Sequence, residues 1–361
     1  MLIAKRVIAL AVSAVTSTLC ILPLSVGVSA PAIAAPSDPS APSNTSALSA
    51  KALVGRYKFV PHYPHVNDVR VLNFPTDSSV GAVYFSSVGA TPQGNDPHRP
   101  ARGMIKVPRG QVVTFAPSHR LCQNPVILRK LAPNSIDRFA LNISSMDDAE
   151  DKFCDNTLSY VSHLKGLVEL LVDRSNSTNS GVAGVKDLPG LQVLSGNETL
   201  LDGSCLNVFA GHKELRCISL YSSEMSDKTM KYLAALPNLE SLNIAHCNVS
   251  DEGLKQLQNC KKLALLDLSV NAKITDNCVP ILLKMKSLRY VSLFRTGIKN
   301  KAVVPLRNSS IEVIILPEPV QYQSQITFIR KAMPKVGVIG ISDPAKRPID
   351  PEVQKMYAPL H

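Results

Sequence analysis

The sequence lacks the marks of most enzyme and cofactor classes. It has no Trp, and aromatic residues make up only 5% of its 361 residues. Its eight Cys residues include no CxxC pair, which argues against a zinc ribbon or a thioredoxin-like site. A nucleophile elbow, an HExxH zinc motif, a phosphate-binding loop and a dinucleotide fingerprint are also missing. We therefore expect no enzymatic activity and no cofactor.

The sequence contains enough hydrophobic residues to form a folded core. Hydrophobic residues make up 45% of it, which excludes wholesale disorder. The formal net charge is +11, and residues 251–310 hold eleven Lys and Arg against four Asp and Glu. Most of these bases fall at helix or turn positions, so we read them as a solvated face, with anionic envelope polymer or lipid headgroups as an alternative partner. Nothing resembles a groove-reading helix or a base-stacking platform, so we expect no nucleic-acid partner.

The first residues have the pattern of an export signal. Lys5 and Arg6 precede an uncharged stretch rich in Ala, Val and Leu that ends in Ala32-Ile33-Ala34. This pattern predicts a signal peptide over residues 1–34, and a protein that is secreted or held in the periplasm or cell envelope. The stretch is long enough to span a bilayer, so an uncleaved anchor is the alternative. No second apolar run of that length follows, and we expect no transmembrane segment after cleavage.

Composition divides the rest of the chain. Residues 35–55 are rich in Pro, Ser and Ala and predict a flexible linker. Residues 56–103 predict a small β-rich cap, and residues 343–361 a C-terminal tail. Cys122 and Cys154, near the front of the folded part, are the candidate disulfide in an exported protein. Cys217 is the candidate for a reactive unpaired thiol, because we expect it on an exposed face.

An internal repeat of about 24 residues organises the segment 104–342. Its clearest copies are Leu239-x-x-Leu242-x-Ile244 and Leu263-x-x-Leu266-x-Leu268. Successive copies are spaced 24, 24, 24, 24, 25 and 23 residues and begin at Leu167, Leu191, Leu215, Leu239, Leu263, Leu288 and Ile311. Weaker copies begin at Val112, Ile136 and Val336, so the sequence predicts about ten units.

The positions within one unit, counted from its first residue as offset 0, predict a strand followed by a helix. Apolar residues at offsets 0, 3 and 5 fit a short strand with one buried face. Ser250-Asp251 is a helix N-cap signal, after which Leu254, Leu257 and Cys260 follow one helical stripe. A single unit cannot bury its apolar side, whereas stacked units can share a parallel sheet. The sequence thus predicts an α/β solenoid of about ten strand–helix coils, preceded by a hairpin of residues 104–107 and 112–115.

The units resemble leucine-rich repeats. The block from Leu239 to Leu263 is similar to the cysteine-containing subtype, because Cys247 and Cys260 take its turn and helix positions. The resemblance implies a horseshoe whose concave sheet binds a partner, usually a protein. We expect a non-enzymatic protein that binds a protein or envelope partner. The alternatives are an enzyme whose catalytic region is residues 56–103, with the repeats as a targeting arm, and a structural envelope protein.

The concave face should consist of offsets 2, 4, 6 and 7 of each unit. We expect the larger side chains there, such as Tyr290 and Phe294, to project above their small neighbours, and exposed aromatic and Arg side chains are typical interface anchors. The predicted partner-binding residues are Asp173, Arg174, Tyr221, Asn243, His246, Asp267, Tyr290, Phe294 and Arg295. His62-x-x-His65 with Asp68 has the residue types of a metal site, but in a Pro-rich and Tyr-rich loop we read them as surface polar groups.

Overall fold

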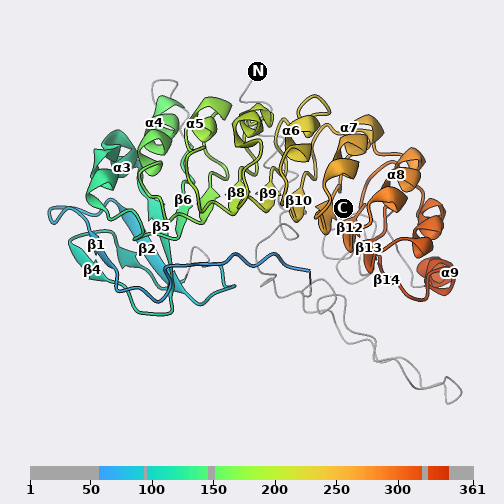
Figure 1. Cartoon of the computed structure of the whole chain (residues 1–361), viewed down its shortest axis with the longest axis horizontal. Helices are drawn as coiled ribbons and strands as arrows, with labels where there is room; N and C mark the ends of the chain where they lie inside the picture. Colours follow the sequence, from blue (N-terminus) through green and yellow to red (C-terminus); the bar gives the residue numbers. More distant parts are fainter. Residues whose placement is uncertain (1–56, 93–95, 145–150, 319–323, 341–361) are drawn as a thin grey trace, which may run out of the picture.

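A curved stack of strand–helix coils forms the body of the protein (Figure 1). The computed structural model describes residues 57–92, 96–144, 151–318 and 324–340. The predicted signal at 1–34, linker at 35–55 and tail at 343–361 lie outside these residues. Within them, no helix is long and apolar enough to cross a membrane.

In the described residues, ten parallel strands line the concave side, and each takes the place that the repeat assigns to it. Leu242 pairs with Ile218 of the preceding strand and with Leu266 of the following one, so equivalent residues stand in register from coil to coil. The predicted solenoid of about ten coils is therefore confirmed. The strands are β5 (Val112–Pro117), β6 (Arg138–Ala140), β7 (Glu169–Leu171), β8 (Val193–Ser195), β9 (Cys217–Ser219), β10 (Ser241–Asn243), β11 (Leu265–Asp267), β12 (Tyr290–Ser292), β13 (Val313–Ile315) and β14 (Gly337–Ile339).

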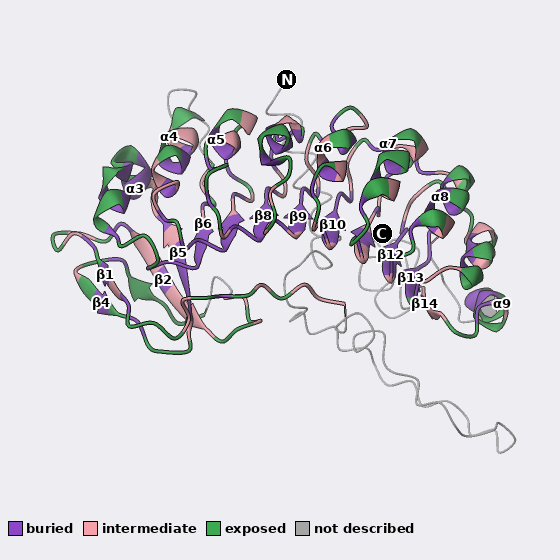
Figure 2. Cartoon of the chain, viewed as in Figure 1, coloured by how far each residue is buried: buried purple, intermediate pink, exposed green. Residues whose placement is uncertain are grey.

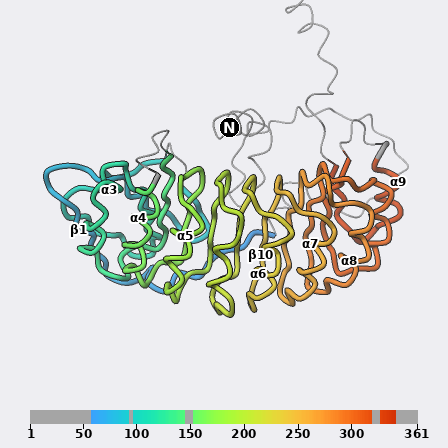
Figure 3. Tube along the Cα trace, turned by 90° about the horizontal axis from the view of Figure 1, so that it is seen from above, coloured from blue at the N-terminus to red at the C-terminus, as the bar shows by residue number. Residues whose placement is uncertain are grey.

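Short helices cover the convex side of the sheet (Figures 1 and 3). Their inner faces and the strands are buried, and their outer faces are exposed (Figure 2). The α-helices are α3 (His119–Gln123), α4 (Asp151–Val161), α5 (Asn179–Ala183), α6 (Met230–Ala234), α7 (Asp251–Gln256), α8 (Val279–Lys284) and α9 (Ser324–Ala332). The 3-10 segments are η1 (Pro125–Lys130), η2 (Ser204–Phe209), η3 (Leu257–Asn259), η4 (Asp276–Cys278) and η5 (Asn300–Asn308).

The N-terminal cap is built differently from the predicted hairpin. β4 (Met104–Lys106) pairs with β1 (Val71–Asn73) as a separate two-stranded sheet. β5 instead pairs antiparallel with β2 (Gly81–Ser86), which is flanked in turn by β3 (Arg99–Pro100). The hairpin prediction is wrong because Gly110, in its turn, donates its N–H to the Val66 carbonyl at 2.9 Å, which draws the turn toward the preceding segment. β2 covers the open edge of the first coil, and this is the expected role of a cap.

Side chains at offset 8, such as Asn271 and Cys247, bind backbone carbonyls where a strand ends. Asn271 donates to the carbonyls of Ile244 at 2.8 Å and Leu268 at 2.9 Å. The Cys247 thiol donates to the Leu220 carbonyl at 3.1 Å from the same offset. These groups satisfy backbone carbonyls where the chain turns away from the sheet, which explains why the repeat tolerates Cys or Asn at this position.

The Ser-Asp and Thr-Asp pairs join neighbouring coils as well as starting helices. Ser250 caps α7, as predicted, by accepting the Glu252 N–H at 3.2 Å. Asp227 of the preceding coil accepts the backbone N–H of Ser250 at 2.8 Å and its hydroxyl at 2.5 Å. Asp251 binds Thr275 of the following coil in the same way, at 3.0 and 2.6 Å. Each Asp thus links two helix starts across the stack.

Gly253→Ala is expected to destabilise the protein by about 1–3 kcal/mol. Ala normally favours a helix over Gly, so propensity alone predicts the opposite sign. At this site a Cβ would lie 2.2 Å from Asp227 Oδ1 and would push away the carboxylate that holds Ser250. Urea denaturation followed by circular dichroism measures the change. The control is Gly190→Ala, whose Cβ would meet no atom closer than 3.6 Å, and its unfolding free energy should stay within about 0.5 kcal/mol of the wild type. A neutral or stabilising effect of Gly253→Ala would contradict the close contact with Asp227.

Candidate functional site on the concave face

A row of side chains follows the end of the strands in six successive coils. All six residues adopt the left-handed backbone region, with φ between 53° and 60°, although none is Gly. Each donates its N–H to a carbonyl of the next coil, for example Arg174 to Asn197 at 2.8 Å and Ser222 to Ala245 at 2.9 Å. The conformation costs roughly 1–2 kcal/mol per non-Gly residue, and it turns these side chains out of the sheet ladder. The row consists of Arg174, Glu198, Ser222, His246, Val270 and Arg295.

A ladder of polar side chains runs beside this row. Asp173 accepts hydrogen bonds from the Ser195 hydroxyl at 2.6 Å and from the Asn197 N–H at 2.8 Å. Asn197 repeats the pattern one coil later, accepting from the Ser219 hydroxyl at 2.6 Å and the Tyr221 N–H at 2.9 Å. Burial raises the pKa of the Asp173 carboxyl, and these donors oppose the rise. The ladder fixes the positions of side chains on three coils.

The ladder borders a hollow of about 220 Å³ over the first coils, which we call the polar hollow. Its charged lining comes from Arg138, Asp173, Arg174 and Glu198, and Tyr221 forms one wall. Arg174 and Glu198 form an ion pair of 2.8 Å in which the Arg174 side chain remains 53% exposed. The hollow brings together three of the predicted binding residues, Asp173, Arg174 and Tyr221.

The predicted exposure of the aromatic residues is wrong. Tyr221, Tyr290 and Phe294 are only 3%, 8% and 8% exposed. Tyr221 packs against Ala245, and its ring centroid lies 6.3 Å from that of His246. On a parallel sheet each side chain packs against its counterpart in the next strand, about 4.8 Å away. Large side chains therefore pack along the surface of the sheet instead of projecting from it.

The other predicted residues differ in exposure. Arg174 is exposed, Asn243 is buried, and Asp173, His246, Asp267 and Arg295 are half-buried. The Arg295 guanidinium carbon lies 5.4 Å from the Phe294 ring centroid, in a cation–π arrangement. His246 Nδ1 lies 3.0 Å from the Ser222 hydroxyl. The accessible predicted residues therefore belong mainly to the row that leaves the sheet.

Residues 57–65, which we call the strap, cross the concave side from the late coils back to the first (Figure 1). Tyr63 anchors the strap: it is 3% exposed, donates its hydroxyl to Glu169 and accepts from Arg138 at 3.0 Å. Arg138 pairs with Glu169 at 2.6 Å and donates to Thr114 at 3.1 Å. Burial, followed by the Glu169 charge, raises the pKa of Tyr63, which keeps its hydroxyl protonated as the donor.

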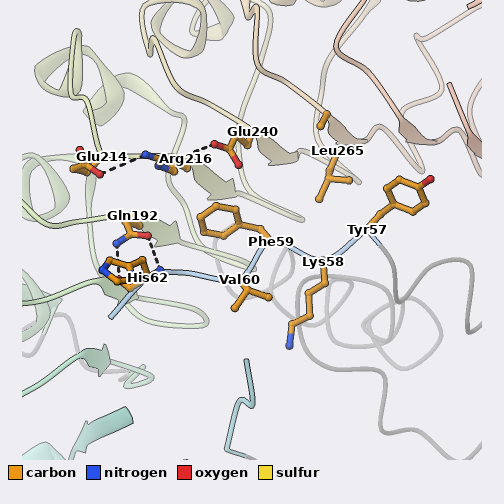
Figure 4. Close-up of a pocket in the computed structure, with 11 residues that line it drawn as sticks. Tyr57, Lys58, Phe59, Val60, His62, Gln192, Glu214, Arg216, Glu240 and Leu265 are labelled. Atoms are coloured by element: carbon orange, nitrogen blue, oxygen red, sulfur yellow. Dashed lines mark hydrogen bonds and ion pairs between the residues drawn. The ribbon is translucent and has the colours of Figure 1, made fainter. Parts of the chain in front are cut away.

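A second anchor holds the backbone of the strap. Gln192 accepts the His62 N–H at 2.9 Å and donates to the His62 carbonyl at 2.7 Å. Beyond this point the strap bridges a cavity of about 530 Å³, which we call the rim cavity (Figure 4). The Phe59 side chain projects from the strap toward the coils there, opposite the 3.0 Å ion pair of Arg216 and Glu240.

The predicted disulfide is absent. Cys122 and Cys154 are both buried free thiols, and the Cys154 thiol donates to the Ile143 carbonyl at 3.4 Å. Burial raises the pKa of both thiols, that of Cys154 to about 11. The expected exposure of Cys217 is also wrong, because it is fully buried and burial raises the pKa of its thiol to about 12. A thiol with that pKa is inert near neutral pH.

The two His residues of the strap make contacts within the fold. His65 Nδ1 lies 2.8 Å from Asp68, and the backbone of His62 binds Gln192. In the part of the chain that the structure describes, no group of three or more His, Cys, Asp or Glu side chains is placed to hold a metal ion.

Asp267→Asn is expected to stabilise the protein at pH 7. Burial raises the pKa of the Asp267 carboxyl, so stability falls as pH rises above the unfolded value of 3.8 toward the folded value. An Asn keeps the acceptor for the Ser269 N–H, now at 2.9 Å, just as Asn243 accepts from Ala245 at 3.0 Å one coil earlier.

Thermal unfolding of the Asp267→Asn variant and the wild type at several pH values measures this. The gain should be largest at neutral pH and should vanish below pH 3.8, where both states of the wild type carry the proton. A gain independent of pH would contradict the role of the carboxylate.

Sequence reasoning missed the residues that meet the strap. Gln192, Arg216, Glu240 and Glu312 all occupy offset 1, directly before a strand, in their respective coils. Their signal was available as polar side chains recurring at one offset of the repeat. Tyr57 and Phe59, by contrast, carry no local pattern that points to coils more than 130 residues away along the chain.

Comparison with known proteins agrees with the repeat. A family model described as Leucine Rich repeat matches residues 235–257, which include the whole of β10 and α7. Among solved structures, the chain is similar to an internalin from Listeria monocytogenes at 18% identity, over 60% of this chain and 70% of that one, with a TM-score of 0.41. The strand register of this chain supports the fold independently of that likeness.

Proposed function

We propose that this chain, a leucine-rich repeat protein by its repeat and its fold, is an exported, non-enzymatic module that binds a protein or envelope partner through its concave face. The polar hollow is the observation that carries the proposal. It combines two guanidinium groups, two carboxylates and a Tyr on a rigid ladder, which suits the charged side chains of a protein partner. The row from Arg174 to Arg295 extends this surface along six coils.

A non-enzymatic role is supported by the state of the cysteines. The seven Cys residues of the described chain are free, and burial raises the pKa of each thiol. A nucleophilic Cys requires the opposite shift. Export rests on the sequence of residues 1–34 and is tested by N-terminal sequencing of the secreted protein, for which Ala35 is the expected first residue.

Charge reversal in the polar hollow tests the binding surface. Full-length protein, immobilised as wild type or as Arg174→Glu, is used to isolate the partner, and the affinity of that partner is then measured. We expect Arg174→Glu to weaken binding roughly tenfold or more, because an exposed Arg next to a Tyr is a typical anchor. Lys284→Glu, an exposed residue of α8 on the convex side, is the matched control and should bind as the wild type does.

A charge swap separates binding from folding. Arg174→Glu combined with Glu198→Arg restores an ion pair between the two positions but exchanges the charges that the partner meets. The swapped protein should unfold like the wild type and still bind weakly. Wild-type affinity in both Arg174 variants would overturn the proposed site.

A further inference from the structure

The strap is held unequally along its length. Its inner half is fixed by the Tyr63 hydroxyl in the buried group with Glu169 and Arg138, and by the paired bonds of His62 with Gln192. Its outer half, Tyr57–Val60, contacts the coils through side chains. The Tyr57 ring lies 6.2 Å from that of Tyr290, and its hydroxyl donates to Glu312.

The outer half has the geometry of a bound extended peptide. Phe59 points to the coils, whereas Lys58 and Val60 point away from them (Figure 4). Val60 is 49% exposed, and the Lys58 ammonium group reaches the Gly89 carbonyl of the cap at 2.5 Å. This alternation is that of a single extended strand that presents every second side chain to a surface.

The outer half of the strap leaves unoccupied space between itself and the coils. The rim cavity leaves about 530 Å³ beside Phe59, between the strap and the starts of the strands. Its walls offer an apolar group, Leu265, and the ion pair of Arg216 and Glu240. Next to it, the cluster of Tyr290, Phe294 and their neighbours receives the Tyr57 ring. A segment with larger apolar side chains would fill more of this space and bury more apolar area.

We propose that the outer half of the strap occupies, within the chain, a binding track for an extended segment of the protein partner that presents two aromatic side chains separated by one residue. The proposal rests on the proposed function, and it adds that the chain's own Tyr57-Lys58-Phe59 masks part of the concave face until the partner displaces it. One aromatic ring binds against Tyr290 and the second enters the rim cavity. The masking reduces the apparent association constant of the partner to its intrinsic value multiplied by the fraction of molecules in which the strap is open.

A peptide of the strap's own sequence, residues 57–66, tests the track when it is labelled and added to the full-length protein. The Tyr57→Ser/Phe59→Ser variant keeps the inner anchors, and we expect it to bind the peptide at least roughly tenfold more tightly than the wild type. The matched control is Val60→Ser, which changes an exposed residue that points away from the coils and should bind as weakly as the wild type. The same peptide with both aromatic residues replaced by Ser should not bind.

Two further measurements make the result decisive. The single Phe59→Ser variant, which keeps the Tyr57 contacts, should show an intermediate gain and guards against misfolding of the double variant. Equal peptide binding by the wild type, Val60→Ser and Tyr57→Ser/Phe59→Ser, or absence of binding to Tyr57→Ser/Phe59→Ser, would overturn the proposal. Dimerisation of the wild type through exchanged straps, seen by size-exclusion chromatography, would also overturn it, because the occupant would then be a second copy.

Failure of this inference and failure of the proposed function have different signatures. The peptide experiment tests the strap track from Arg216 to Glu312, whereas the Arg174→Glu experiment tests the polar hollow, which ends at Tyr221. If partner binding depends on Arg174 but not on Tyr57 or Phe59, the concave face remains the proposed binding site. The strap is then not part of that site.

Discussion

The Glu169→Ala variant is expected to lose about 3–5 kcal/mol of unfolding free energy. Its side chain and that of Arg138 are 9% and 3% exposed, and their atoms lie 2.6 Å apart. Removing the carboxylate leaves a buried guanidinium whose remaining neighbours, Thr114 and the Tyr63 hydroxyl, carry no negative charge. An unpaired buried charge costs far more than an exposed pair gains, so the effect should be large.

A neighbouring ion pair provides the control. Glu198→Ala removes the partner of Arg174, a side chain that is 53% exposed and can be solvated by water, and should cost less than about 1 kcal/mol. Urea unfolding of both variants under one set of conditions compares them. Glu169→Gln, which retains an acceptor, should fall between the wild type and Glu169→Ala. Equal losses for Glu169→Ala and Glu198→Ala would contradict the burial of the first pair.

The second large effect is expected for Leu266→Ala, with a loss of about 2–5 kcal/mol. Leu266 is fully buried in β11 and stands in register with Leu242 of β10 and Val291 of β12. Its removal leaves a cavity that weakens contacts with both neighbouring coils, and in a stacked array these contacts supply much of the stability.

An apolar surface residue serves as the control for Leu266→Ala. Leu200 is 47% exposed in a turn, and Leu200→Ala should change the unfolding free energy by no more than about 0.5 kcal/mol. Thermal unfolding followed by circular dichroism distinguishes the two. Similar small losses in both variants would mean that the repeated Leu positions do not share one core.

The fold could be predicted because the stack imposes the same requirement on every coil. Leu215, Leu239 and Leu263 recur at 24-residue intervals, and each is at most 1% exposed. A side chain that fits between two coils must be apolar in each of them, so the period appears in the sequence itself. The helix start at Ser250 could be predicted for the same reason, since its capping bonds are local.

Exposure on the concave face could not be predicted from the period. Alternation assigns Tyr290 to that face correctly, but its burial depends on Tyr57, 233 residues earlier in the chain, and on Val313 of the next coil. The prediction of a Cys122–Cys154 disulfide is wrong for a related reason. A count of cysteines does not reveal that the Cys154 thiol donates to a backbone carbonyl. Contacts between distant segments leave little periodic signal in one sequence.

Site-specific photo-crosslinking tests the central claim, recognition through the concave face, most directly. A photoreactive phenylalanine analogue is placed at Ser222, in the row that leaves the sheet, or at Lys284 on α8, in two otherwise identical full-length proteins. With the partner isolated by the wild type, we predict a covalent adduct from position 222 and none from position 284. An adduct from position 284 alone, or from neither position, would contradict recognition through this face.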